Sequence, residues 1–98
     1  MQPLEYHPEA RWELLQAQKW YEHQSPGLGV EFLSEVQEAV HAITTWPKTW
    51  PRHNRHFRRF LLRRFPFAVI YRPFRSQIIV IAVMHLKRRP SYWKARLH

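Results

Sequence analysis

Ninety-eight residues, 45% of them hydrophobic and 15% aromatic, suffice for the core of one domain, which we expect to span residues 1–98. The absence of cysteine excludes disulfide frameworks and thiolate metal sites, and no run approaches the roughly 20 apolar residues of a membrane-spanning helix. A formal net charge of +9, from 16 Lys and Arg against seven acids, favours an anionic partner, either nucleic acid or an acidic protein. The first residues lack the features of a signal peptide, so we expect a cytoplasmic protein without a membrane partner.

The N-terminal half predicts a short strand followed by two helices. Residues 2–6 suit a strand, and Pro8 suits the first turn of a helix that extends to about Gln24. The apolar positions of this helix recur at intervals of three or four residues: Ala10, Leu14, Ala17 and Tyr21. After the break SPGLG at 25–29, a second helix repeats the pattern with Phe32, Leu33, Val36, Ala39, Val40 and Ile43. So tight a connection predicts an antiparallel helical hairpin.

The C-terminal half predicts an antiparallel meander of three strands. It begins with a loop at 46–54, whose two Trp-Pro steps we expect to seal the lower edge of the core. Strand-forming residues then occupy 56–64, 67–72 and 77–85, separated by short breaks. The last strand shows no polar alternation, so we expect it in the centre of the sheet with both faces covered. A basic, aromatic tail at 86–98 follows.

The predicted order of elements describes an α+β fold of the type β-α-α-β-β-β, with the helical hairpin on one face of a small curved sheet. The charges are also divided between the helical half and the strand-forming half of the chain. Residues 1–45 contain all seven Glu and two cations, whereas residues 46–98 contain fourteen cations and no acid. We therefore expect the sheet face opposite the helices to carry an open basic groove.

Two Arg-Arg pairs, at 58–59 and at 63–64, place one cation on each face of the predicted strand, because alternate residues of a strand face opposite sides. Charge on the helical side is costly unless it is paired. The second helix supplies the acids Glu31, Glu35 and Glu38, so we expect some arginines to hold strand and helix together. We expect the groove, which receives the partner, to comprise Arg59, Arg63, Arg72, Arg75, Lys87, Arg88, Arg89, Tyr92 and Trp93.

Trp93 has two interpretations, since a terminus stays ordered only when it is tied down. Its indole either docks on the sheet or anchors a partner, as tryptophans at interface hot spots do.

Proton-transfer chemistry has only weak candidates in this sequence. His85 ends the last strand near Arg88 and is the best acid–base candidate on spacing, although a packed strand-end histidine is the more frequent situation. The tail supplies two further weak catalytic candidates, Tyr92 and Arg88, because an arginine can stabilise negative charge in the transition state. His53 and His56 have no Cys or Asp nearby, so we expect neither a metal site nor a cofactor.

Three segments in order, WYEHQSPGLGVEFLSEV, RRFPFAVIYR and IAVMHLKRRPSYW, resemble the ParE/RelE superfamily of bacterial toxins. The resemblance spans Ala10 to Trp93 and is closest to the branch of plasmid-stabilisation proteins. It implies a strand, two helices and three strands, the order that the periodicity predicts. It also implies the toxin half of a type II toxin–antitoxin pair, neutralised by a small antitoxin. Given the basic charge, we expect that antitoxin to dock through an acidic amphipathic segment.

The superfamily contains two kinds of toxin, and the resemblance leaves both targets open. RelE-like members cut messenger RNA on the ribosome, whereas ParE-like members poison DNA gyrase. In RelE-like toxins an arginine typically opens the strand that corresponds to 67–72, where this chain has Phe67 and Ala68. Arg88 matches a basic position of the family, and Tyr92 or Trp93 takes the place of a C-terminal aromatic residue. We therefore expect a gyrase-binding toxin that is not a hydrolase. The alternatives are a ribosome-dependent endoribonuclease and a non-toxic antitoxin-binding module.

Overall fold

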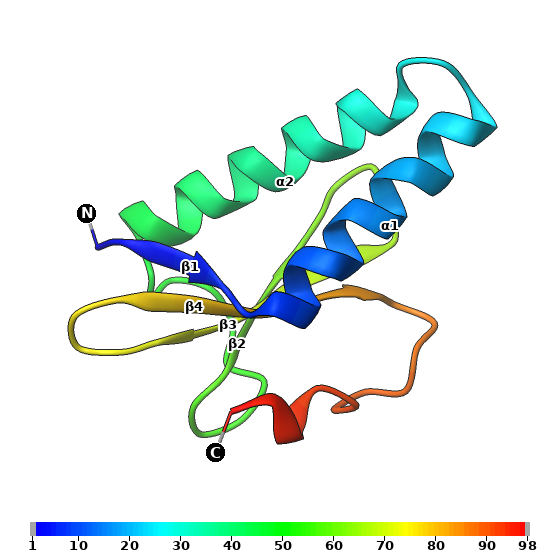
Figure 1. The fold of residues 1–98 in the computed structure, drawn as a ribbon. Coiled ribbons are helices and arrows are strands. Elements are labelled where there is room, and N and C mark those ends of the chain that lie inside the picture. Colours follow the sequence, from blue (N-terminus) through cyan, green and yellow to red (C-terminus); the bar gives the residue numbers. More distant parts are fainter. Residues whose placement is uncertain (1, 98) are drawn as a thin grey trace.

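The computed structural model describes residues 2–97, in which two helices cover one face of a four-stranded sheet (Figure 1). The elements in chain order are β1 (Leu4–Tyr6), α1 (Pro8–Gln24), α2 (Leu28–Thr45), β2 (Arg58–Leu61), β3 (Phe67–Pro73), β4 (Ile78–His85) and a 3-10 turn, η1 (Lys94–Arg96). This arrangement confirms the predicted α+β class and the predicted order of elements. No helix within the described residues is long and apolar enough to cross a membrane.

The sheet has the order β1-β4-β3-β2. Strands β2, β3 and β4 form the predicted antiparallel meander, while β1 runs parallel to β4 on its other side. Strand β4 therefore has a neighbour on each edge and is central, as its unbroken apolar sequence indicates. The β1 register ends at Val80, so the last residues of β4, up to His85, extend past the end of β1.

Strand β2 is shorter than the predicted strand at 56–64, because the chain turns after Leu61. The backbone N–H of Leu62 donates to the carbonyl of Phe67 across that turn. The backbone N–H groups of Arg63 and Arg64 donate to the carboxylate of Glu35 on α2. A side chain of the helix thus replaces the partner strand that these two residues lack.

The turn between the helices depends on two glycines and one carboxylate. Gly27 has a φ of +89°, a left-handed conformation that glycine adopts without steric cost. Glu22 accepts hydrogen bonds from the N–H groups of Gly27 (2.8 Å) and Gly29 (2.9 Å). These bonds hold the Glu22 pKa below its ordinary value, because they favour the charged carboxylate. The same carboxylate therefore caps the first turn of α2.

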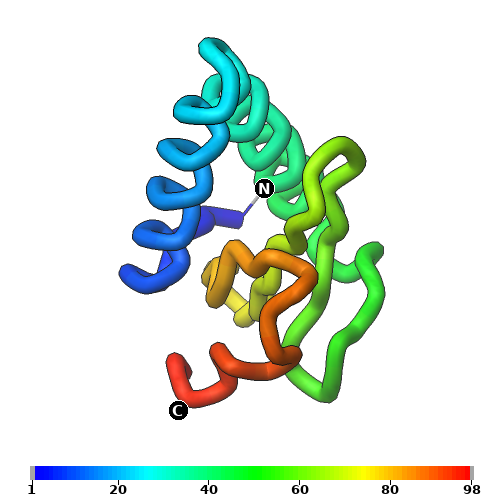
Figure 2. The backbone as a smooth tube through the Cα atoms, turned by 90° about the vertical axis from the view of Figure 1, so that its right-hand side faces the viewer, coloured from blue at the N-terminus to red at the C-terminus, as the bar shows by residue number. Residues whose placement is uncertain are grey.

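Apolar residues pack on both faces of the sheet. The larger cluster lies between the helices and the sheet and includes the predicted helical stripes, with Ala10, Leu14, Phe32, Val36 and Ile43 buried. A second cluster lies on the opposite face, where Trp93 packs on β3 and β4 residues such as Ile70 and Ile81. Figure 2 shows the C-terminal segment, orange to red, on the side of the sheet away from the helices. The expectation of an open basic groove on this face is therefore wrong, since the tail covers it.

The tryptophans of the loop after α2 have different environments. Trp50 is half-buried and packs edge-on against Phe60, with ring centroids 4.5 Å apart, so it seals the core edge as predicted. Trp46 is 63% exposed and does not.

We predict that Gly29→Ala lowers the free energy of unfolding by about 1–3 kcal/mol, the typical cost of overpacking. A Cβ atom at this position lies 2.6 Å from the backbone oxygen of Gln18 and 2.9 Å from the Cβ of Glu22, where the helices approach each other. Denaturant unfolding measures the effect. Gly27→Asn is the comparison, because nothing lies within 4 Å of its Cβ and only the backbone strain of a side chain at φ +89° remains, which asparagine tolerates better than most residues. Equal stability of Gly29→Ala and the unmodified protein contradicts this account of the hairpin.

Candidate protein-interaction site

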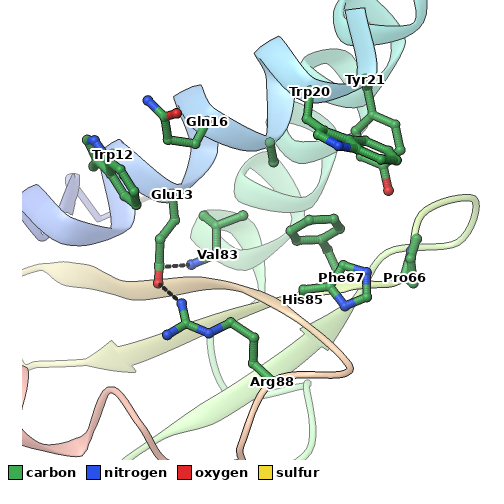
Figure 3. A pocket seen from close by; sticks show the side chains of 11 residues that line it. Trp12, Glu13, Gln16, Trp20, Tyr21, Pro66, Phe67, Val83, His85 and Arg88 are labelled. Atoms are coloured by element: carbon green, nitrogen blue, oxygen red, sulfur yellow. Dashed lines mark hydrogen bonds and ion pairs between the residues drawn. The ribbon is translucent and has the colours of Figure 1, made fainter. Parts of the chain in front are cut away.

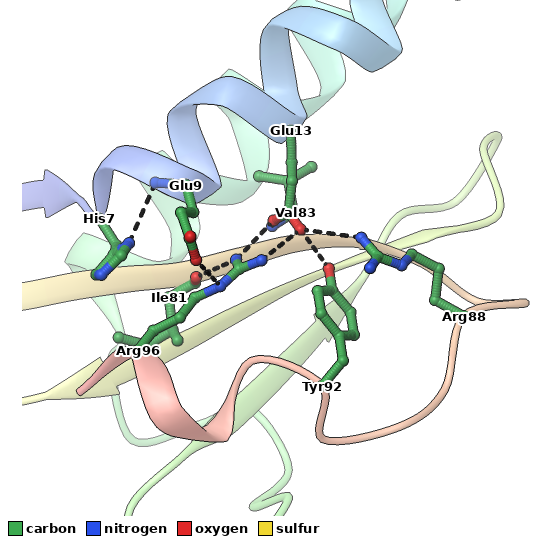
Figure 4. A network of polar contacts seen from close by, with 8 residues as sticks. All are labelled: His7, Glu9, Glu13, Ile81, Val83, Arg88, Tyr92 and Arg96. Carbon is green, nitrogen blue, oxygen red and sulfur yellow. Dashed lines mark hydrogen bonds and ion pairs between the residues drawn. The ribbon is translucent and has the colours of Figure 1, made fainter. Parts of the chain in front are cut away.

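The buried carboxylate of Glu13 on α1 joins the helix, the central strand and the tail (Figure 4). Its Oε2 accepts from the Tyr92 hydroxyl (2.6 Å), Arg96 Nη2 (2.8 Å) and Arg88 Nη1 (3.3 Å). Its Oε1 accepts from Arg96 Nη1 (2.9 Å) and from the backbone N–H of Val83 (3.0 Å). Five hydrogen bonds therefore converge on one side chain that is only 8% exposed. This satisfies the condition under which a buried charge is tolerated.

Arg96 is the main cationic partner of Glu13. It also donates to the backbone oxygen of Ile81 (2.9 Å), and its Nε lies 2.8 Å from Glu9 Oε2. The network thus balances two carboxylates with two guanidinium groups, those of Arg88 and Arg96. Neither Glu13 nor Arg96 is among the site residues predicted from the sequence. The sequence does contain one indication of the role of Glu13, because this residue lies between Ala10 and Leu14 in the apolar stripe of the helix. The structure shows that it is buried there.

Tyr92 and Arg88, the catalytic candidates of the tail, have structural roles in this network. Burial raises the pKa of the Tyr92 phenol far above its ordinary value, and its hydrogen bond to Glu13 raises the pKa further. The phenol is therefore a proton donor to Glu13 and stays protonated at neutral pH. The guanidinium carbon of Arg88 lies 3.7 Å from the centre of the Tyr92 ring, a cation–π contact. Both side chains are thereby fixed in place.

His85 is a packed and hydrogen-bonded strand end. Its Nδ1 accepts from the backbone N–H of Lys87 at 3.0 Å, and its ring centroid lies 5.0 Å from that of Phe67. No group of three or more potential metal ligands occurs within residues 2–97. Burial lowers the pKa of His53, and the nearby cations Arg59 and Lys94 lower it further.

An apolar groove of about 540 Å³ lies between α1 and the adjacent ends of β3 and β4; we call it the α1 groove (Figure 3). Its residues are Trp12, Glu13, Gln16, Ala17, Trp20, Tyr21, Pro66, Phe67, Val83, His85 and Arg88. Trp12 and Trp20 are 62% and 59% exposed, although both are large and apolar. Residues eight apart lie on one face of a helix, so the two indoles flank the same groove. Exposed apolar surface of this kind marks an interaction site.

One edge of the α1 groove carries a cation, Arg88. The Arg88 side chain is 51% exposed and reaches Glu13 from the tail, as Figure 3 shows. Lys87 and Arg89, its neighbours in the chain, are exposed as well. The groove therefore combines an apolar floor and aromatic walls with positive charge at one edge. That combination suits an amphipathic segment that carries bulky apolar and acidic side chains.

The remaining residues predicted for partner binding lie in other places. Arg63 is exposed at the turn after β2, next to Arg64, which forms ion pairs with Glu31 (2.9 Å) and Glu35 (3.4 Å). The prediction that an arginine of this strand holds it to α2 is confirmed for Arg64. Arg59 is exposed on β2.

Arg72 and Arg75 lie near the β3–β4 turn, where Arg72 stacks 4.5 Å from the centre of the Phe74 ring. The predicted cations therefore do not form one groove. Trp93 is fully buried, so its docking on the sheet is confirmed and its alternative role as an exposed anchor is wrong.

Comparison with known proteins supports the observed fold and indicates a family. The family model described as ParE toxin of type II toxin-antitoxin system, parDE, matches residues 4–90. A solved structure described as the chromosomal ParDE TA system from P. aeruginosa has a TM-score of 0.64 and 18% sequence identity. The alignment covers 89% of this chain and 98% of that chain. No curated protein sequence matches this chain significantly.

We predict that Glu13→Ala lowers the free energy of unfolding by about 3–5 kcal/mol, because it leaves the Arg96 guanidinium buried without its main partner. Denaturant unfolding measures this loss, and trypsin cleavage after Lys87 and Arg88 is expected to accelerate as the tail detaches. Glu9→Ala is the matched control. Its carboxylate contacts the same arginine but is 63% exposed, so its loss is expected to cost less than about 1 kcal/mol. Equal effects of the two substitutions contradict a central role for Glu13.

Proposed function

The chain belongs to the ParE toxin family of type II toxin–antitoxin systems, and on that basis we propose that a cognate antitoxin neutralises it by docking in the α1 groove. Residues 1–98 act as a single toxin domain, since both apolar clusters share one sheet. The observation that carries the proposal is the pair of exposed tryptophans, Trp12 and Trp20, beside the cationic rim at Arg88.

The groove specifies the chemistry of the docking segment. Trp12 and Trp20 are eight residues apart on α1, about 12 Å at the helical rise of about 1.5 Å per residue. A partner helix matches this distance with apolar residues two turns apart. Acidic residues beside them face Arg88 at the edge of the groove, next to which Lys87 and Arg89 are exposed. The apolar contacts supply most of the affinity, because surface ion pairs contribute little, while the charges accelerate association.

The target that the family resemblance favours is DNA gyrase, bound by the toxin without hydrolysis. Three observations support a binding protein over an endoribonuclease. The Tyr92 hydroxyl is committed to Glu13, the Arg88 guanidinium to Glu13 and the Tyr92 ring, and His85 Nδ1 to the Lys87 backbone. Cleavage of RNA requires a base that removes the proton of a 2′-hydroxyl group. The residues that match the family's basic and aromatic positions are thus engaged within the fold.

We predict that Trp12→Ala and Trp20→Ala each weaken antitoxin affinity at least about 30-fold, because loss of an interface hot spot costs about 2 kcal/mol or more. Titration calorimetry with the antitoxin encoded beside the toxin measures the change, and affinity is expected to fall at high salt. Trp46→Ala is the matched control, because Trp46 is equally exposed, at 63%, but lies outside the groove. All three variants are expected to keep their melting temperature. A loss of affinity in Trp46→Ala alone, or in none of them, rejects the groove as the docking site.

A second prediction concerns the target. Expression of the toxin without its antitoxin is expected to arrest growth and inhibit DNA supercoiling by gyrase, and to leave messenger RNA uncut in primer extension. Codon-specific cuts with normal supercoiling favour the endoribonuclease instead. Normal growth, with antitoxin binding retained, identifies a non-toxic binding module.

A further inference from the structure

A second concentration of positive charge lies outside the α1 groove, around a hollow of about 200 Å³; we call it the loop cluster. Its residues come from the loop after α2 and from β2 and β3: Lys48, Arg52, Arg55, His56, Arg58, Arg72 and Pro73. Five of the seven carry a fixed positive charge, and none is acidic. The α1 groove and the loop cluster have no residue in common.

Within residues 2–97, no acidic side chain pairs with a cation of the loop cluster. Among the residues that the structure describes, ion pairs form at Arg64, Arg88 and Arg96, and none involves a cation of the loop cluster. Like charges that converge in this way repel one another and lower stability. An anionic ligand with several charges relieves this repulsion.

Hydrogen bonds hold the cluster in shape. Arg58 Nη1 donates to the backbone oxygens of Lys48 (3.1 Å) and Trp50 (2.8 Å), which ties the loop to β2. Arg52 forms an isolated β-bridge with Arg58. The side chain of Asn54 accepts from two backbone N–H groups further along the loop. The site is therefore preorganised, which lowers the entropic cost of binding a ligand.

The composition of the loop cluster distinguishes a phosphate backbone from an acidic peptide. A peptide needs apolar contacts for affinity, since exposed ion pairs contribute little. None of the exposed large apolar residues lines this hollow, whereas two of them line the α1 groove. Nucleic acid gains affinity from phosphate contacts themselves, through release of counterions. Arginine, which supplies four of the five fixed charges, presents a planar donor fork that suits phosphate oxygens.

We propose that the loop cluster binds the phosphate backbone of nucleic acid without reading its base sequence. This goes beyond the antitoxin docking and target proposed above and does not depend on them. Figures 1 and 2 both place the loop that follows α2 away from α1. A toxin whose α1 groove is occupied therefore keeps its nucleic-acid surface accessible.

Fluorescence anisotropy of labelled mixed-sequence oligonucleotides with the full-length protein tests this proposal. The double variant R52Q/R55Q removes two exposed cluster arginines. The matched control R11Q/R63Q removes two exposed arginines that line neither the loop cluster nor the α1 groove, and it leaves the same net charge. We expect R52Q/R55Q to weaken binding at least about tenfold and to lower the salt slope by about 1.5–2 between about 50 and 200 mM salt. We expect the control to weaken it less than about threefold. Circular dichroism melts confirm that both variants fold.

Separate arms with duplex DNA, single-stranded DNA and single-stranded RNA identify the kind of nucleic acid, and tight binding in any arm supports the proposal. Equal losses in the two variants overturn it, because net charge alone then explains binding. Absence of binding in all arms at low salt also overturns it. Competition by poly-glutamate at equal charge concentration overturns it in favour of an acidic protein partner.

Discussion

The carboxylate of Glu13 completes the open edge of the central strand. Strand β4 continues from Val80 to His85 after its neighbour β1 has ended, which leaves backbone groups on that edge without a strand partner. Arg96 donates to the carbonyl of Ile81, and Glu13 accepts from the N–H of Val83. Because Glu13 and Arg96 also bind each other, two side chains from opposite ends of the sequence take the place of a strand. The last turn of the tail is thereby fixed against the first turns of α1.

The fixed position of the tail determines which surfaces the protein can offer a partner. With the tail in place, the second face of the sheet is filled by Trp93 and is removed from solvent. Arg88 is held at the rim of the α1 groove by the same carboxylate. Exposed aromatic surface therefore collects on α1, and uncompensated positive charge collects on the loop after α2. A protein of this size can thus present two surfaces of different chemistry, one apolar with a charged edge and one almost purely cationic.

Local patterns of the sequence predict most of the fold. The spacing of Phe32, Val36 and Ile43 shows which face of α2 is buried, and the unbroken apolar run of β4 indicates its central position. Strand alternation, together with the acids of α2, predicts that some arginines hold this segment to the helix, and Arg64 does so through Glu31 and Glu35. The first two inferences follow from residues that are close together in the sequence. The third follows from the cost of leaving a charge unpaired near the core.

The candidate site depends on contacts that local patterns do not contain. Glu13 reaches Arg96 across 83 residues of sequence, and no periodicity links the two. Without that contact, the tail is an undefined basic segment and the second sheet face is expected to be open. The α1 groove was missed for a related reason. Trp12 and Trp20 follow helical spacing but lie off the core stripe, and only the packed structure shows that a groove lies beside them.

The Glu13 network also limits the part that Tyr92 can take in proton transfer. A tyrosine acts as a proton acceptor only when its pKa approaches the ambient pH. Here burial and a neighbouring carboxylate both move the Tyr92 pKa in the opposite direction. Freeing the phenol requires it to leave Glu13, which also removes one of the contacts that hold the tail on the sheet. Proton transfer by Tyr92 and a closed tail therefore compete for the same hydrogen bond. A toxin that acts by binding meets no such conflict, because its contact residues stay at the surface while the tail remains closed.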